Sequence, residues 1–203
     1  MRLPEASDAD LDCIGAARMR RKQVMTDAPL HADALRVVRV ARKIPLLSMI
    51  FRRLPPRQQE IVALLKRTPL FADLSLRELI ELLPLIHERS YGDGETVMAQ
   101  GEPGLGLYVL MRGEVEVRQE DARRNDGIAR LGPGEVFGDV SFVDGSPRSA
   151  TVVACRHAEL IGLYRTELLD LMERKPHLAS KILFSLARQL GIRLRAMLQA
   201  RTR

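Results

Sequence analysis

Short apolar runs separated by glycines fill the middle of the chain, at residues 94–97, 107–110, 113–117, 128–131, 151–154 and 160–163. Runs of this length, rich in β-branched residues and bounded by turn residues, are typical of strands rather than helices. Many short strands with a turn after each one indicate an antiparallel sheet that closes on itself. This pattern predicts an antiparallel β-roll or jelly-roll for the central part of the chain.

Helical patterns flank the β segment on both sides, so the predicted class is mainly β with flanking helices (α+β), with N-terminal helices and a long C-terminal helix. On the N-terminal side, Pro55 and Pro56 begin one helix, because proline is tolerated in the first helical turn. Ser75 and Glu78 form a capping-box pattern that begins a second helix, which is expected to stop near Pro84.

Two helices are expected at the C-terminal end, over residues 166–175 and 177–199. Thr166 is the expected N-cap of the first, and Pro176 ends it. In the second helix an apolar residue recurs every four positions, which gives far more apolar surface than one roll needs to cover. Gly191 lowers its helix propensity and predicts a bend. The apolar residues are Leu178, Ile182, Leu186, Leu190, Leu194 and Leu198, widened by Ile192 and Met197.

Residues 137–151 place a glycine turn, a carboxylate and an arginine beside small hydroxyl residues. Gly138 allows the backbone to bring N–H groups close to an anion, and Arg148 can bond two phosphate oxygens at once. Asp139 can accept hydrogen bonds from ribose hydroxyls but would repel a phosphate. Pro147 fixes its own φ and limits how Arg148 enters its strand. The stretch therefore predicts a binding site for a sugar phosphate.

This stretch resembles the phosphate-binding cassette of the cyclic nucleotide-binding domain family. The matching positions are Phe137, Gly138, Pro147, Arg148, Ser149, Ala150 and Thr151. Gly-Glu, Gln-Gly-Glu, Leu-Tyr and Gly-Glu-Val motifs extend the resemblance over about residues 67–200. Two positions depart from the family pattern. Asp139 stands in place of the ribose-binding glutamate, and Leu105 stands where a polar or acidic turn residue is common.

The resemblance implies a cyclic nucleotide receptor, a regulatory module in intracellular signal transduction that acts on an effector protein the sequence does not name. Cyclic AMP is expected rather than cyclic GMP, although Ser149 could bond either a phosphate oxygen or a guanine edge. No cofactor is expected. The 177–199 helix would close over the purine and form the seam of a homodimer, or else pack on its own domain. The implied contacts are Arg148, Ser149, Gly138 and Val140 for the phosphate, Asp139 and Gly138 for the ribose, and Arg188 and Arg193 for the base.

Two other classes of function are disfavoured by the sequence, and a third stays open. The histidines are scattered without metal-ligand spacing and no catalytic motif is present, so we expect no enzyme and no metal site. Regulators of this family place a helix-turn-helix after the long helix, whereas this chain stops at Arg203, so no specific DNA binding is expected. The shorter Asp139 keeps open a roll that has lost its ligand and acts as a protein-interaction scaffold.

Residues 1–66 are expected to form a helical, partly disordered extension of the domain at residues 67–203. A basic amphipathic pattern within residues 32–53 predicts packing on the domain or on a dimer mate, or a weak membrane-surface contact. The net charge of +6 is concentrated at the two ends of an acidic body, unlike the uniform basic face of a nucleic-acid binder. Cys13 and Cys155 are far apart and no signal peptide or spanning segment is evident, which favours the cytoplasm. Cys155 is expected to be a buried strand residue.

Overall fold

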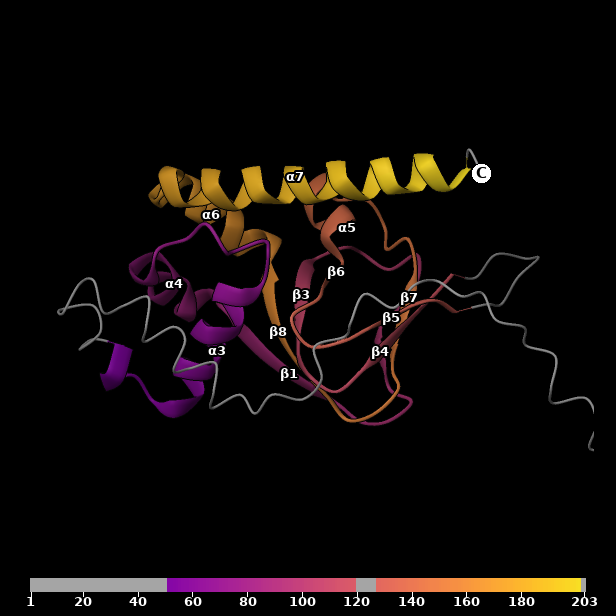
Figure 1. Cartoon of the computed structure of the whole chain (residues 1–203), viewed down its shortest axis with the longest axis horizontal. Helices are drawn as coiled ribbons and strands as arrows, with labels where there is room; N and C mark the ends of the chain where they lie inside the picture. Colours follow the sequence, from indigo (N-terminus) through magenta and orange to yellow (C-terminus); the bar gives the residue numbers. More distant parts are fainter. Residues whose placement is uncertain (1–50, 120–126, 202–203) are drawn as a thin grey trace, which may run out of the picture.

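The computed structural model describes residues 51–119 and 127–201, which fold into two four-stranded antiparallel sheets with helices packed against one of them (Figure 1). The first sheet has the order β1 (His87–Tyr91), β8 (Ala158–Tyr164), β3 (Gly106–Arg112), β6 (Val136–Phe137). The second has the order β2 (Thr96–Met98), β7 (Thr151–Ala154), β4 (Val115–Arg118), β5 (Gly127–Leu131). This architecture confirms the predicted β-roll with flanking helices.

Strand β3 is buried along almost its whole length because it contributes to two hydrophobic cores. Successive side chains of a strand point to opposite faces. Leu107 and Val109 therefore pack with the helices, while Tyr108 and Leu110 face the interior of the roll. Phe137 joins the interior core from β6. The sequence pattern of a continuous apolar run at this strand thus reflects burial on both faces.

The helices on the N-terminal side form where the sequence predicts them. Helix α3 (Pro56–Arg67) begins with proline in its first turn, and α4 (Leu76–Leu82) begins with the complete capping box of Ser75 and Glu78. A short 3₁₀ helix, η1 (Leu83–Leu85), follows α4 and contains Pro84. The buried face of α3 lies in the same hydrophobic core as α4, β3 and the C-terminal helices. The boundary predicted after residue 66 therefore separates residues that share one core.

The C-terminal helices are α6 (Arg165–Arg174) and α7 (Pro176–Arg201), and they correct two predictions. The N-cap of α6 is Tyr164, so Thr166 lies inside the first turn and does not cap it. Helix α7 runs through Gly191 without interruption and without the predicted bend (Figure 1). A β-carbon at Gly191 would have no atom within 4 Å, so no packing constraint explains the glycine there.

The apolar stripe predicted along α7 does not stay on one face. A helix advances about 100° per residue, so a strict four-residue repeat drifts by about 40° at each step. Leu178, Ile182 and Leu186 are buried, whereas Leu194 and Leu198 have turned away and are 59% and 55% exposed. The second half of α7 therefore presents its apolar residues to solvent.

Three further predictions concern Cys155 and two segments near the N-terminus. Cys155 is half-buried in the bend after β7, so the expectation of a buried strand residue is wrong. Residues 1–24 and most of the 32–53 segment, with its proposed membrane contact, lie outside the described residues. Within the described ranges, no helix is long and apolar enough to cross a membrane.

Candidate functional site

The predicted cassette folds into a strand, a left-handed turn and a short helix. Strand β6 ends at Phe137, and Gly138 adopts a φ of 75°, a conformation that strongly favours glycine. Helix α5 (Asp139–Asp144) begins immediately afterwards and ends at Gly145, which also has a positive φ. The chain then returns through Pro147 and Arg148 to β7. Gly138 and Arg148, ten positions apart, are thereby brought together.

Arg148 is buried beneath the Gly138 turn with only 5% of its surface exposed. Its Nη1 donates to the carbonyl oxygen of Gly138 at 3.0 Å, and its Nη2 donates to that of Gly106 at 2.7 Å. The guanidinium also lies 5.8 Å from the ring centroid of Tyr108, which stacks on Phe137. Burial lowers the pKa of Arg148 from its usual value, partly offset by Tyr108 and Glu102. A confined guanidinium with unused N–H donors is a strong site for an anion.

The main chain on either side of Arg148 is fixed by the loop that precedes β3. The Arg148 N–H donates to the carbonyl of Glu102 at 2.8 Å, and its own carbonyl accepts from the N–H of Gly101 at 2.9 Å. The Glu102 carboxylate accepts from the N–H of Ala99 and so serves this turn. The sequence motif Gln-Gly-Glu thus positions the arginine. These backbone contacts carry no residue-type signal at position 148, so sequence reasoning missed them.

Asp139, the predicted ribose contact, is 3% exposed and is paired with a side chain from α7. Arg193 Nη1 donates to Asp139 Oδ2 at 2.5 Å, and Arg193 Nη2 donates to the carbonyl of Val136 at 3.0 Å. The structure therefore brings Arg193 to the cassette, but onto a carboxylate. The family resemblance suggests Arg193 as a contact for the base, and nothing in the sequence predicts that it pairs with Asp139.

The remaining predicted residues are placed less centrally. Val140 and Ser149 lie within the cassette but are exposed. Arg188, the other candidate for the base, pairs with Asp73 at 2.9 Å, in the segment between α3 and α4. Both partners are about half exposed. Arg188 is therefore engaged away from the cassette in this structure.

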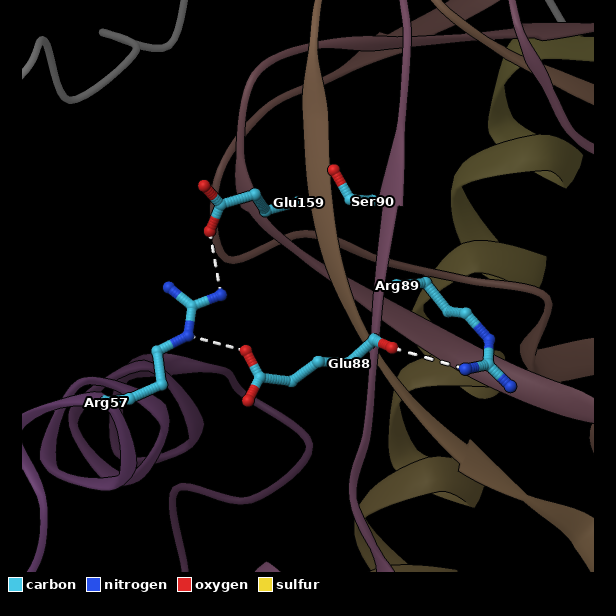
Figure 2. Close-up of a pocket in the computed structure, with 5 residues that line it drawn as sticks. All are labelled: Arg57, Glu88, Arg89, Ser90 and Glu159. Atoms are coloured by element: carbon cyan, nitrogen blue, oxygen red, sulfur yellow. Dashed lines mark hydrogen bonds and ion pairs between the residues drawn. The ribbon is translucent and has the colours of Figure 1, made fainter.

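A separate hollow lies between α3 and the outer edge of β1 (Figure 2). Arg57 reaches across it and pairs with Glu88 at 2.5 Å and with Glu159 at 2.8 Å. Arg89 points away from this pair, as Figure 2 shows. Arg57 also pairs with Glu60, and these carboxylates balance its charge and would repel a phosphate, so this hollow does not offer a second anion site. No cluster of potential metal ligands occurs within residues 51–119 and 127–201.

The comparisons with known proteins concern the segment that carries the cassette. The family described as "Cyclic nucleotide-binding domain" matches residues 88–175. The "Cyclic AMP receptor protein" of Thermus thermophilus is 36% identical over 127 residues, covering 62% of this chain and 59% of that protein. The chain therefore spans less than two thirds of that relative.

Two solved structures agree with this match. The crystal structure of a cyclic nucleotide-binding domain from Methylobacillus flagellatus is 30% identical with a TM-score of 0.63, covering 69% of this chain and 79% of that one. The N-terminal domain of a transcriptional regulator from Streptomyces coelicolor is 32% identical with a TM-score of 0.59, covering 63% of this chain and 92% of that one. The likeness thus includes the roll and extends beyond the cassette.

Proposed function

The chain belongs to the cyclic nucleotide-binding domain family, and we propose that it is a non-enzymatic receptor that binds cyclic AMP in preference to cyclic GMP. The observation that carries this proposal is the placement of buried Arg148 directly beneath the Gly138 turn. The similarity to the Cyclic AMP receptor protein of Thermus thermophilus supports cyclic AMP. A cytoplasmic location, an effector protein and the absence of specific DNA binding stay predictions.

The cyclic phosphate would contact the Gly138 turn, where the backbone N–H groups at the start of α5 and the side chain of Arg148 converge. Arg148 uses two of its five N–H donors on carbonyl oxygens, which holds the guanidinium in one orientation. Its remaining donors can serve an anion at this turn. Ser149 and Val140 border the same turn and would complete the phosphate contacts.

The ribose would contact Asp139, the first residue of α5. Its carboxylate can accept hydrogen bonds from a ribose hydroxyl, while its negative charge keeps the phosphate on the arginine side. Asp139 is one methylene shorter than the glutamate of the family pattern, so the sugar must approach the α5 backbone more closely. Helix α7 already lies over α5 (Figure 1), which places it to respond to this contact.

The alternative is a roll without a nucleotide ligand that acts as an interaction scaffold. One observation favours it, because the Asp139 carboxylate is already paired with Arg193 and almost fully buried. Calorimetric titration of the protein with cyclic AMP and with cyclic GMP decides between the two functions. No heat with either cyclic AMP or cyclic GMP at near-millimolar concentration would favour the scaffold.

Calorimetric titration of Arg148 variants tests the proposed receptor. Arg148→Ala should weaken cyclic AMP binding by about 2–4 kcal/mol, because a desolvated anion loses its charged partner. Arg148→Lys retains the charge but loses the forked geometry, so an intermediate loss is expected. Arg156→Ala removes an exposed arginine from the bend after β7 and serves as the matched control. Wild-type affinity in Arg148→Ala would contradict the phosphate site.

A further inference from the structure

The triplet Gly-Leu-Tyr occurs twice in the chain, once in β3 and once in β8. The two strands pair antiparallel in a register that sets Gly106 opposite Tyr164 and Tyr108 opposite Gly162. The leucine of each triplet packs against the helices. Because successive side chains of a strand alternate between faces, both tyrosines lie on the face toward the interior of the roll.

Each tyrosine ring covers the glycine that lies opposite it. A β-carbon on Gly106 would be 2.9 Å from Cδ1 of Tyr164, and a β-carbon on Gly162 would be 3.0 Å from Cε1 of Tyr108. Both separations are too short for an ordinary contact, so the two glycines make room for the two rings. The rings of Tyr108 and Tyr164 are diagonal neighbours on one face of the strand pair, within reach of each other. We call these two residues the tyrosine platform.

The platform contacts Arg148 both directly and through the backbone. The guanidinium lies 5.8 Å from the ring centroid of Tyr108, and its Nη2 donates at 2.7 Å to the carbonyl of Gly106, the glycine that Tyr164 covers. Burial raises the pKa of Tyr108 and the neighbouring Tyr164 raises it further, whereas the charge of Arg148 lowers it. Within residues 51–119 and 127–201, no carboxylate forms an ion pair with Arg148. Its orientation therefore depends on this ring and on carbonyl oxygens.

Tyr164 is in turn held from the edge of the sheet. Arg89, on the edge strand β1, donates from Nη2 to the hydroxyl oxygen of Tyr164 at 2.9 Å. The His87 ring lies against Tyr164 at a tilt, with the ring centroids 4.8 Å apart. A series of contacts thus runs from β1 through Tyr164 and Gly106 to Arg148, and all of its members except Arg148 lie outside the cassette.

We propose that Tyr108 and Tyr164 are positioning residues of the nucleotide site, which hold the Arg148 guanidinium in the orientation that binds the phosphate. This inference rests on the receptor function proposed above. An arginine that is free to rotate loses side-chain entropy when it binds an anion, whereas an arginine fixed in advance does not. Both tyrosines therefore raise nucleotide affinity without contacting the nucleotide.

Calorimetric titration with cyclic AMP compares substitutions that keep or remove the ring. Tyr108→Leu should bind about tenfold more weakly than the wild type, because Arg148 loses the aromatic face beside it. Tyr108→Phe keeps that face and should stay within about twofold of the wild type. Tyr164→Leu uncovers Gly106 and should bind about threefold more weakly. Tyr91→Leu, at the partly buried third tyrosine of the same core, is the matched control and should bind like the wild type.

Circular dichroism in the near ultraviolet tests the contact without nucleotide. The chain has three tyrosines and no tryptophan, so the tyrosine band reports on Tyr91, Tyr108 and Tyr164 alone. Arg148→Lys should change this band in the nucleotide-free protein, because the guanidinium no longer lies beside the Tyr108 ring. Arg156→Lys, at an exposed position in the bend after β7, should leave the band unchanged.

The outcomes separate the platform from the receptor function. Wild-type affinity in Tyr108→Leu, equal weakening by Tyr91→Leu, or equal weakening by Tyr108→Phe would overturn the platform and leave the receptor function intact. If Tyr108→Leu does not fold, an unchanged tyrosine band in Arg148→Lys would still overturn the platform. Absence of cyclic AMP binding by the wild type would overturn the receptor function and this inference together.

Discussion

A β-carbon at position 138 would lie 2.6 Å from Nη1 of Arg148 and 3.1 Å from the carbonyl oxygen of Gly106. Gly138→Ala would therefore force the buried arginine away from its acceptors and strain a φ of 75°. We expect a loss of about 2–4 kcal/mol in the free energy of unfolding, from the left-handed penalty together with the steric conflict. Nucleotide affinity should fall with it, as measured by denaturant unfolding and calorimetry on the same variant.

Gly134 provides the control for the conformational part of this effect. Its φ is 88°, but a β-carbon there would have no atom within 4 Å. Gly134→Ala should cost only about 1–2 kcal/mol and leave nucleotide affinity unchanged. Equal losses in the two variants would show that the close approach of Arg148 to Gly138 does not matter for stability.

At the scale of residues, the sequence predicts contacts within the cassette loop but not the contacts between the cassette and α7. The spacing of Gly138 and Arg148 follows from one loop, so a local motif predicts that they meet. The pair of Asp139 and Arg193 is separated by 54 positions and depends on the rotation of α7 about its axis. The acceptors of Arg148 are backbone carbonyls, which any residue provides. Neither contact leaves a pattern in residue types.

At the scale of elements, Glu78 connects the start of α4 to α7. Its Oε2 accepts from the backbone and hydroxyl of Ser75, both at 2.8 Å, and its Oε1 accepts from Lys181 at 2.7 Å. Burial raises the pKa of Glu78, but the hydrogen bonds from Lys181 and Ser75 outweigh it and lower the pKa to about 2. The ionised carboxylate therefore serves as a helix cap and as an attachment of α7.

Glu78→Gln should lower the free energy of unfolding by about 1–2 kcal/mol at neutral pH. Because the folded pKa lies below the usual 4.5, the stabilisation is fully present above pH 4.5 and is lost as the pH falls toward 2. The difference between variant and wild type should shrink across that window in denaturant unfolding. Glu173→Gln, at an exposed position on α6, is the matched control and should change the free energy of unfolding by no more than about 0.5 kcal/mol.

The elements themselves were largely predictable, and the exceptions have physical reasons. Proline and the capping box fix the starts of α3 and α4, because they act through local backbone geometry. The sequence predicts the wrong N-cap for α6, because the actual N-cap, Tyr164, makes no side-chain cap hydrogen bond. Leu194 belongs to the predicted apolar stripe because a four-residue repeat resembles the helical period over a few turns. Over the length of α7 the difference between a repeat of four residues and the helical period of 3.6 residues moves the later leucines off the buried face.

At the scale of the whole molecule, ion pairs join α3 to strands β3 and β8 of the roll. Arg57 and Arg112 share Glu60 and Glu159, with separations of 2.8 to 3.3 Å. Hydrogen bonds and attraction from both arginines lower the pKa of Glu159 despite its partial burial, which alone would raise it. No local pattern predicts this network, since its members come from α3, β3 and β8. It explains why α3 belongs to the folded unit although the cassette resemblance does not reach it.

The exposed apolar side of α7 supports a prediction about assembly. Leu194 and Met197 are exposed and lie three positions apart, with Leu190 one turn before Leu194, and we expect two copies of α7 to pack along these residues. Residues 174–203 contain eight basic residues and no acidic one, and five of the eight pair with acidic side chains elsewhere in the fold. The positive charge that remains makes two such helices repel each other at low salt. The homodimer should therefore be tighter at high ionic strength, which is the opposite of an ion-pair interface.

Sedimentation measurements over a range of protein and salt concentrations test this assembly. Leu194→Glu places a charge in the middle of the proposed seam and should give a monomer at concentrations where the wild type is dimeric. Phe184 is 72% exposed but lies about 80° from Leu194 around the helix axis. Phe184→Glu should therefore leave the dimer intact. A wild-type protein that stays monomeric at high concentration and high salt would contradict the seam. If only Phe184→Glu dissociates the dimer, the contact lies on a different side of α7, and the rotation of its apolar stripe has no role in assembly.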